Sequence, residues 1–306
     1  MAYCFKRKES IPKAIRRIGN ERVLHAFECV ADCRQGEAIH SARKDIKKIR
    51  ALLRLVRAET RGREFGLITK RLRKTAQLLA EPRDAYIKLA TLTSLSRHFK
   101  GQLAPRALRH IRAELRKDFE DEMRSFAKKR TARAIRRRLG RVQKQLKCLE
   151  VPSKGWKALR EGVRTAYLDG RQAYQSALKT PSSKNFHEWR KRAKDLWYQV
   201  TLMRRIWPEQ MDALARDLDM LGEHLGDDHD LVMLRHALQK MCIQKRQPLE
   251  VEVLHGLVEE RQRELRDAAL AIGTRFYAEK PAAFCNRLAG YWKVWANKKK
   301  VLQPAR

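Results

Sequence analysis

Hydrophobic residues recur every three or four positions along almost the whole chain, which is the spacing of one face of an α-helix. Strand-like alternation is nearly absent, and glycine and proline are sparse, with 14 and 9 among 306 residues. The pattern therefore predicts an all-α protein. The expected helices lie at about 12–35, 38–58, 65–80, 84–99, 105–129, 131–148, 156–178, 184–206, 209–226, 230–246, 249–279 and 281–297.

Turn signals divide these helices into two parts of similar length. The best linker candidate is 149–155, which holds the one Pro-Ser-x-Gly cluster near the middle of the chain. We therefore expect a first helical half at 10–148, this linker, a second helical half at 156–297 and a basic tail at 298–306.

The two predicted halves carry a repeated motif. In each copy a histidine is followed by arginine at +3, lysine at +4 and lysine at +7; the residues are His40, Arg43, Lys44 and Lys47, then His187, Arg190, Lys191 and Lys194. A second match joins 72–84 to 218–230. The offset is 147 residues for the first match (40 to 187) and 146 for the second (72 to 218). A duplicated helical unit that folds as a pseudo-symmetric pair follows from this repeat.

Each copy of the motif predicts a helix with one apolar and one basic side. At about 100° per residue, the basic residues near each histidine gather on an arc opposite the apolar residues, and almost no acid shares that arc. We call these arcs the first and the second basic face. The first comprises His40, Arg43, Lys44, Lys47 and Arg54, and the second His187, Arg190, Lys191, Lys194 and Arg205.

The charge balance favours a polyanionic partner for these faces. The chain has 70 Lys and Arg against 35 Asp and Glu, a formal charge of +35, and self-repulsion of this size destabilises a compact protein unless an anion relieves it. Ordinary solvated helix faces pair acids with bases at four-residue spacing, and these faces do not. The guanidinium group of arginine can donate two hydrogen bonds to the oxygens of a phosphoryl group. Cations one helical turn apart suit a chain of phosphates better than one small anion. Further candidates are Arg71, Lys74, Arg112 and Arg116.

The repeated motif resembles the two signature helices of the CHAD family, the conserved-histidine α-helical domain. The first helix is matched by His40, Arg43, Lys47, Lys48, Ile49 and Arg50, and the second by His187, Arg190, Lys191, Lys194, Leu196 and Tyr198. Segments around Arg83-Asp84 and Leu225-Gly226 also resemble paired elements of the family, so the resemblance spans about 10–297.

The resemblance implies two helical bundles around a basic cleft and the binding of inorganic polyphosphate, often on polyphosphate granules. The sequence departs from the family at two positions. Trp197 stands where the family usually has arginine, and Thr201 where glutamate is common. We therefore expect the second basic face to bind more weakly than the first.

Two other partners remain open at this stage. A nucleic-acid backbone would also satisfy the net charge, although base recognition needs exposed aromatics or a helix that directs Asn, Gln or Arg at base edges. An acidic protein partner is the third possibility, and it predicts grooves of mixed apolar and basic character. The chain shows no stretch of about 18 uncharged apolar residues, so we expect a cytoplasmic protein that has no contact with membranes.

Two groups of residues are candidates for catalysis or metal binding, and we favour a structural role for both. Asp227, Asp228, His229 and Asp230 resemble an acid–base cluster. Asp84 and Asp230 are, however, expected to begin helices, where a carboxylate accepts free backbone amides. His25, Cys29 and Cys33 recur every four residues along one helix face, but cysteine is also a common buried helix residue. We expect no enzyme activity, no cofactor and no bound metal.

Overall fold

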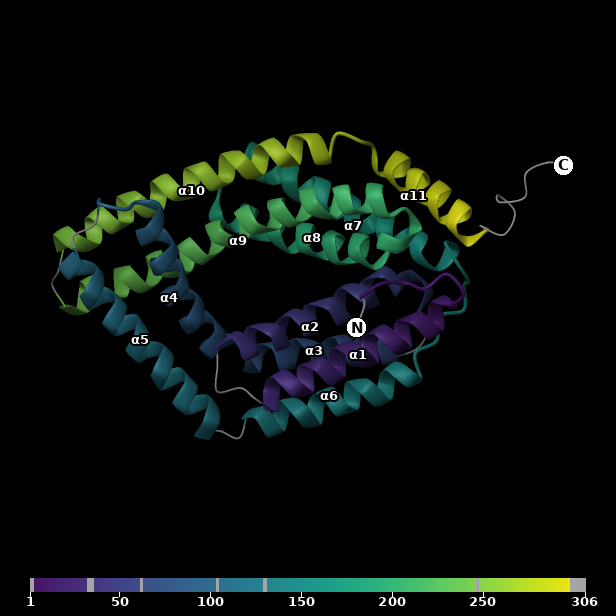
Figure 1. Ribbon diagram of the computed structural model, residues 1–306, viewed down its shortest axis with the longest axis horizontal. Helices are drawn as coiled ribbons and strands as arrows, with labels where there is room; N and C mark the ends of the chain where they lie inside the picture. Colours follow the sequence, from purple (N-terminus) through teal and green to yellow (C-terminus); the bar gives the residue numbers. More distant parts are fainter. Residues whose placement is uncertain are drawn as a thin grey trace.

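The computed structural model describes residues 3–31, 36–60, 63–102, 105–128, 131–245 and 248–297, and within these ranges all regular structure is helical (Figure 1). This confirms the all-α prediction. The elements are α1 (Ile11–Ala31), α2 (Gly36–Leu55), the 3₁₀ helix η1 (Arg57–Glu59), α3 (Glu64–Leu78), α4 (Ala80–His98), α5 (Pro105–Lys128), α6 (Thr131–Lys147), α7 (Lys157–Lys179), α8 (Ser183–Leu202), the 3₁₀ helix η2 (Arg204–Ile206), α9 (Pro208–Lys245), α10 (Pro248–Phe276) and α11 (Pro281–Ala296).

The helix α9 differs from the prediction, because two expected helices form one continuous helix. Leu225 and Leu231 are both buried, so the hydrophobic stripe runs through the segment that was expected to be a turn. Asp230 therefore lies in the interior of α9, and Asp84 lies inside α4, which begins at Ala80. The expectation that these two aspartates begin helices was wrong.

The order of elements in the first half recurs in the second. The ends of α2 and α8 differ by 147 residues (36 to 183 and 55 to 202), and η1 and η2 differ by the same number (57 to 204). Helix α7 corresponds in the same way to α1, and α9 takes the place of α3 and α4 together. The repeat seen in the sequence is thus a repeat of whole elements. Their relation by a pseudo-two-fold axis stays a prediction.

The main hydrophobic core joins the two halves. It includes Ile46 and Ile49 of α2 together with Trp189 and Leu196 of α8, all at most 1% exposed. The contact between α2 and α8 is therefore part of the core.

A second, smaller core lies at the opposite end of the molecule. There α4 and α5 diverge from α1, α2, α3 and α6 and pack near α9 and α10 (Figure 1). Leu92 and Leu115 of the first half meet Leu234 and Leu254 of the second in this core. Helix α4 thus contacts both α2 and α9, so its own side chains lie near the motif helices.

A glycine allows the close approach of α7 to the end of α2. A Cβ atom added at Gly162 would lie 2.0 Å from the backbone oxygen of Leu55, so no larger residue fits without backbone movement. This contact fixes the C-terminal end of α2 against the second half. Among the described helices, none is both long and apolar enough to cross a membrane.

Candidate anion-binding site

The two motif helices place their cations around a common centre. Lys47 of α2 is half-buried, and its pKa is lowered to about 7 by burial and then by the charges of Arg190, Arg83 and Arg43. Arg190 belongs to α8 and Arg83 to α4. Three helices therefore contribute positive charge to the surroundings of one lysine.

Histidines from both halves lie at the same centre. Burial, followed by the charges of Lys44 and Arg83, lowers the pKa of His40 to about 4. Burial, followed by the charges of Arg190 and His187, lowers the pKa of His229 to about 3. The rings of His187 and His229 lie 4.2 Å apart between centroids. At neutral pH the imidazoles of His40 and His229 are uncharged within the cationic surroundings.

These residues form the candidate site. We call them the cation cluster, and its members are His40, Arg43, Lys47, Arg83, His187, Arg190, Lys194 and His229.

Two arginines of the cation cluster have hydrogen-bond partners within the chain. Arg83 is 8% exposed at its side chain and donates to Asp84 Oδ1 at 2.9 Å and to Asp230 Oδ1 at 3.4 Å. Arg43 Nη1 donates to the backbone oxygen of Ala76 at 2.7 Å.

Two buried nitrogen atoms of the cation cluster, both on α8, have no hydrogen-bond partner within the described part of the chain. They are Nε of Arg190 and Nδ1 of His187. A buried group of this kind normally has a partner, so these two atoms mark unused capacity to bind an acceptor.

Two glycines of α9 lie against the cations of α8, and Gly222 makes room for Lys194. A Cβ atom at Gly222 would lie 2.5 Å from Cε and 2.7 Å from Nζ of Lys194, and a Cβ atom at Gly226 would lie 3.7 Å from Nε of Arg190. Lys194 Nζ also lies 3.3 Å from Asp219 Oδ1 and 4.5 Å from the centre of the Trp197 ring. The tryptophan that replaces the family's usual arginine thus holds the neighbouring lysine.

Some members of the basic faces lie at the margin or outside the cluster. Lys44 and Lys191 are exposed, and Lys191 forms an ion pair with Glu188. Lys48 lies on another side of α2, where its Nζ is 5.5 Å from the centre of the Tyr3 ring.

Arg50 and Arg54 occupy the other end of α2. Arg54 forms an ion pair with Asp195 of α8. It also lines a cavity of about 380 Å³ between α2, α7 and α8. Burial lowers the pKa of Arg50, with Arg54 adding to the effect. Both arginines therefore belong to the contact between the halves at some distance along α2 from His40.

The remaining predicted residues lie on other elements. Arg71 and Lys74 belong to α3, Arg112 and Arg116 to α5, and Arg205 to η2. Lys74, Arg116 and Arg205 are exposed, and Arg71 and Arg112 are half-buried. Their part in binding stays a prediction.

Sequence reasoning did not place Arg83 and His229 in the site. The signal for them was present, because the two positions differ by 146 residues and are the next-to-last residues of the second repeated segment. The repeat was interpreted as evidence for symmetry, whereas it also marks the side chains that α4 and α9 contribute to the cluster.

The acidic group of α9 has structural partners in the described residues. Asp228 is 2% exposed and accepts hydrogen bonds from Gln262 Nε2 at 2.9 Å and Arg266 Nε at 2.7 Å, both on α10. Asp230 accepts from Arg83. The carboxylates are thus used to join α9 to α10 and to orient an arginine, which supports the structural interpretation of this group.

Comparisons with known proteins agree on the family and the fold. The CHAD domain model matches residues 18–239. The crystal structure of the CHAD domain from the plant Ricinus communis is 16% identical, with 91% of this chain and 95% of that chain covered and a TM-score of 0.68. PptA from Streptomyces chartreusis is 14% identical, with 87% of this chain and 98% of that chain covered and a TM-score of 0.62. No curated protein sequence matches the chain. At these identities the two structures show a shared fold.

Proposed function

The chain belongs to the CHAD domain family, and from that premise we propose that it binds inorganic polyphosphate through the cation cluster without catalysing a reaction. The family is associated with polyphosphate. The proposal places the protein in the cytoplasm and, where polyphosphate accumulates, on its granules.

The observation that carries the proposal is the convergence of both motif helices on one group of cations. The pKa of Lys47 is lowered to about 7, because burial and the charges of three arginines disfavour the protonated form of the lysine. A polyanion in this place would supply the missing negative charge, and would draw Lys47 into its charged form. It would also offer acceptors to Arg190 Nε and His187 Nδ1.

The extent of the cluster suits a polymer. His40 and Lys47 are seven residues apart on α2, which corresponds to about 10 Å along a helix. The exposed Lys44 continues the positive charge at the margin. A single phosphate would engage only part of this surface, whereas a chain of phosphates can follow it.

The test is a competition titration at physiological salt. Labelled long-chain polyphosphate bound to the full chain is challenged with unlabelled polyphosphate, single-stranded RNA and duplex DNA at equal total charge. We expect polyphosphate to displace the label at the lowest concentration, with affinity that falls steeply as salt rises because counterions are released. Displacement by RNA or DNA at equal or lower concentration would reject polyphosphate in favour of a nucleic-acid backbone.

A further inference from the structure

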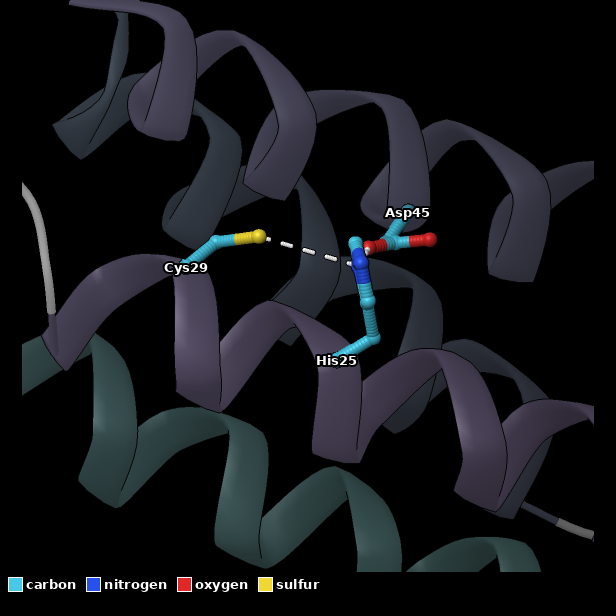
Figure 2. Close-up of side chains that lie close together, drawn as sticks. All are labelled: His25, Cys29 and Asp45. Atoms are coloured by element: carbon cyan, nitrogen blue, oxygen red, sulfur yellow. Dashed lines mark hydrogen bonds and ion pairs between the residues drawn. The ribbon is translucent and has the colours of Figure 1, made fainter. Parts of the chain in front are cut away.

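Three side chains with metal-binding atoms converge between α1 and α2, outside the cation cluster (Figure 2). His25 and Cys29 lie one turn apart on α1, and Asp45 reaches them from α2. Their ligand atoms all lie within 4.8 Å of one another. His25 Nδ1 is 2.5 Å from Asp45 Oδ2 and 3.7 Å from Cys29 Sγ.

These distances are close to those of a tetrahedral zinc site. Zinc binds sulfur at about 2.3 Å and imidazole nitrogen at about 2.0–2.1 Å, so two such ligands at a tetrahedral angle lie about 3.6 Å apart. The distance from Cys29 to His25 already has this value within about 0.1 Å. Nitrogen and carboxylate oxygen would lie about 3.3 Å apart, so His25 and Asp45 would separate by less than about 1 Å.

The carboxylate is held so that one of its oxygens faces His25. Asp45 is 1% exposed, and its Oδ1 accepts from Arg22 Nη1 at 3.3 Å, whereas Oδ2 faces His25. A metal would take the place of the proton between Oδ2 and Nδ1, and Arg22 would continue to orient the ligand. The side chain of His25 is 48% exposed, which leaves access for the ion and room for water as a fourth ligand.

We propose that His25, Cys29 and Asp45 bind a divalent metal of the zinc type. Thiolate, imidazole and carboxylate together suit Zn²⁺ and Co²⁺ and disfavour Ca²⁺ and Mg²⁺, which bind oxygen. On binding, Cys29 releases its thiol proton to solvent, and neutral His25 carries its proton on Nε2. The sequence led us to expect no metal here because cysteine is also a common buried helix residue, and it did not reveal Asp45, which is distant along the chain from His25 and Cys29. Cys33, the other residue of that pattern, lies outside the described residues.

The competing explanation is a hydrogen bond from His25 that serves only to satisfy a buried carboxylate. Cobalt(II) distinguishes the two, because a thiolate ligand produces a charge-transfer absorption that a hydrogen-bonded triad cannot. The probe is Co²⁺ alone, added to the full chain under reduction by a non-chelating phosphine. We expect the absorption to saturate at one equivalent and to disappear when Zn²⁺ is added.

The decisive variant is Cys29→Ser, with the exposed Cys148→Ser as the matched control. Loss of a residue that hydrogen-bonds to a metal ligand lowers metal affinity about 10–100-fold. Loss of the ligand itself should therefore weaken Co²⁺ binding at least as much. Cys148→Ser should bind as the unaltered chain does. Zn²⁺ should also raise the melting temperature of the unaltered chain and of Cys148→Ser, but not of Cys29→Ser. The proposal fails if the charge-transfer band is absent, or if it survives in Cys29→Ser. These outcomes are independent of polyphosphate binding.

Discussion

Lys47 shows at the scale of one residue how binding capacity conflicts with stability. Its pKa is about 7 in the folded chain against an ordinary value of 10.5. Between these values the unfolded chain holds more protons than the folded chain, so this residue makes the free energy of unfolding increase as pH rises from about 7 to 10.5. Below pH 7 the lysine is charged in both states, and its full unfavourable effect on folding is present.

Lys47→Met should therefore raise the melting temperature of the free protein at pH 7 while it weakens polyphosphate binding. A hydrogen bond to a charged group contributes about 1.5–3 kcal/mol, so we expect a loss of about tenfold or more in affinity. Lys44→Met removes the same charge at an exposed position of the same helix, at the margin of the cluster, and should weaken binding less than Lys47→Met does. Thermal unfolding and titration of both variants test the point. A lower melting temperature with unchanged affinity in Lys47→Met would contradict it.

The histidines predict a second dependence on pH. The pKa of His40 is about 4 and that of His229 about 3, both below the ordinary 6.5. The free protein should lose stability as pH falls from about 6.5 toward 4, because the unfolded chain binds more protons in that window. A bound polyanion raises these pKa values, so affinity should increase as pH falls from 7 to 5.

Calorimetry in two buffers of different ionisation enthalpy measures the protons taken up on binding. At pH 5.5 we expect uptake on binding, and the double variant His40→Gln, His229→Gln should reduce it. The explanation would be wrong if no protons were taken up, or if the double variant took up as many as the unaltered chain.

At the scale of elements, the sequence predicted single helices well and the contacts between helices poorly. Apolar spacing identified α2 and α8 and their basic sides, because a helical period reports which residues share a face. It did not predict that α9 continues through Gly226, since glycine and aspartate are common at helix ends. The structure explains Gly222 of the same helix by the space that Lys194 occupies, because an added Cβ atom would lie 2.5 Å from Cε of that lysine. Such contacts depend on the absence of a side chain and leave no periodic signal.

Gly222→Ala tests the contact between α8 and α9. The added methyl group would displace the end of Lys194, a flexible group, so it should disturb the site more than the fold. Alanine is favoured over glycine within a helix by about 0.8–1 kcal/mol, which offsets the crowding. We expect an unchanged or slightly higher melting temperature and a several-fold weaker affinity for polyphosphate.

The control for this variant is Gly290→Ala on α11, where an added Cβ has no neighbour within 4 Å in the described structure. It should gain stability and keep its affinity. If Gly222→Ala and Gly290→Ala bind polyphosphate equally well, the position of Lys194 does not matter for binding.

At the scale of the whole molecule, the charge of +35 opposes folding and one ligand should relieve it. A ligand that binds only the folded chain raises the free energy of unfolding by RT ln(1 + [L]/Kd). This increase is about 2.7 kcal/mol at a ligand concentration of 100 times Kd. Saturating polyphosphate should therefore raise the melting temperature by several degrees, and less at high salt. An unchanged melting temperature at saturation would show that no preformed site exists.

The central claim is that one cluster built from both halves binds the ligand, and three double charge reversals test it most directly. Arg43→Glu with Lys47→Glu alters α2, Arg190→Glu with Lys194→Glu alters α8, and Arg136→Glu with Arg137→Glu alters the exposed side of α6. Each pair changes the net charge equally, so long-range attraction alone predicts equal losses of affinity.

The measurement is the dissociation constant for polyphosphate of the three double variants, each shown to be folded by circular dichroism. We expect the α2 and α8 pairs to lose at least about tenfold more affinity than the α6 pair, since each cluster residue forms a charge-assisted hydrogen bond. The α2 pair should be affected most, because Trp197 replaces an arginine on α8. Equal losses in all three variants would contradict the shared site.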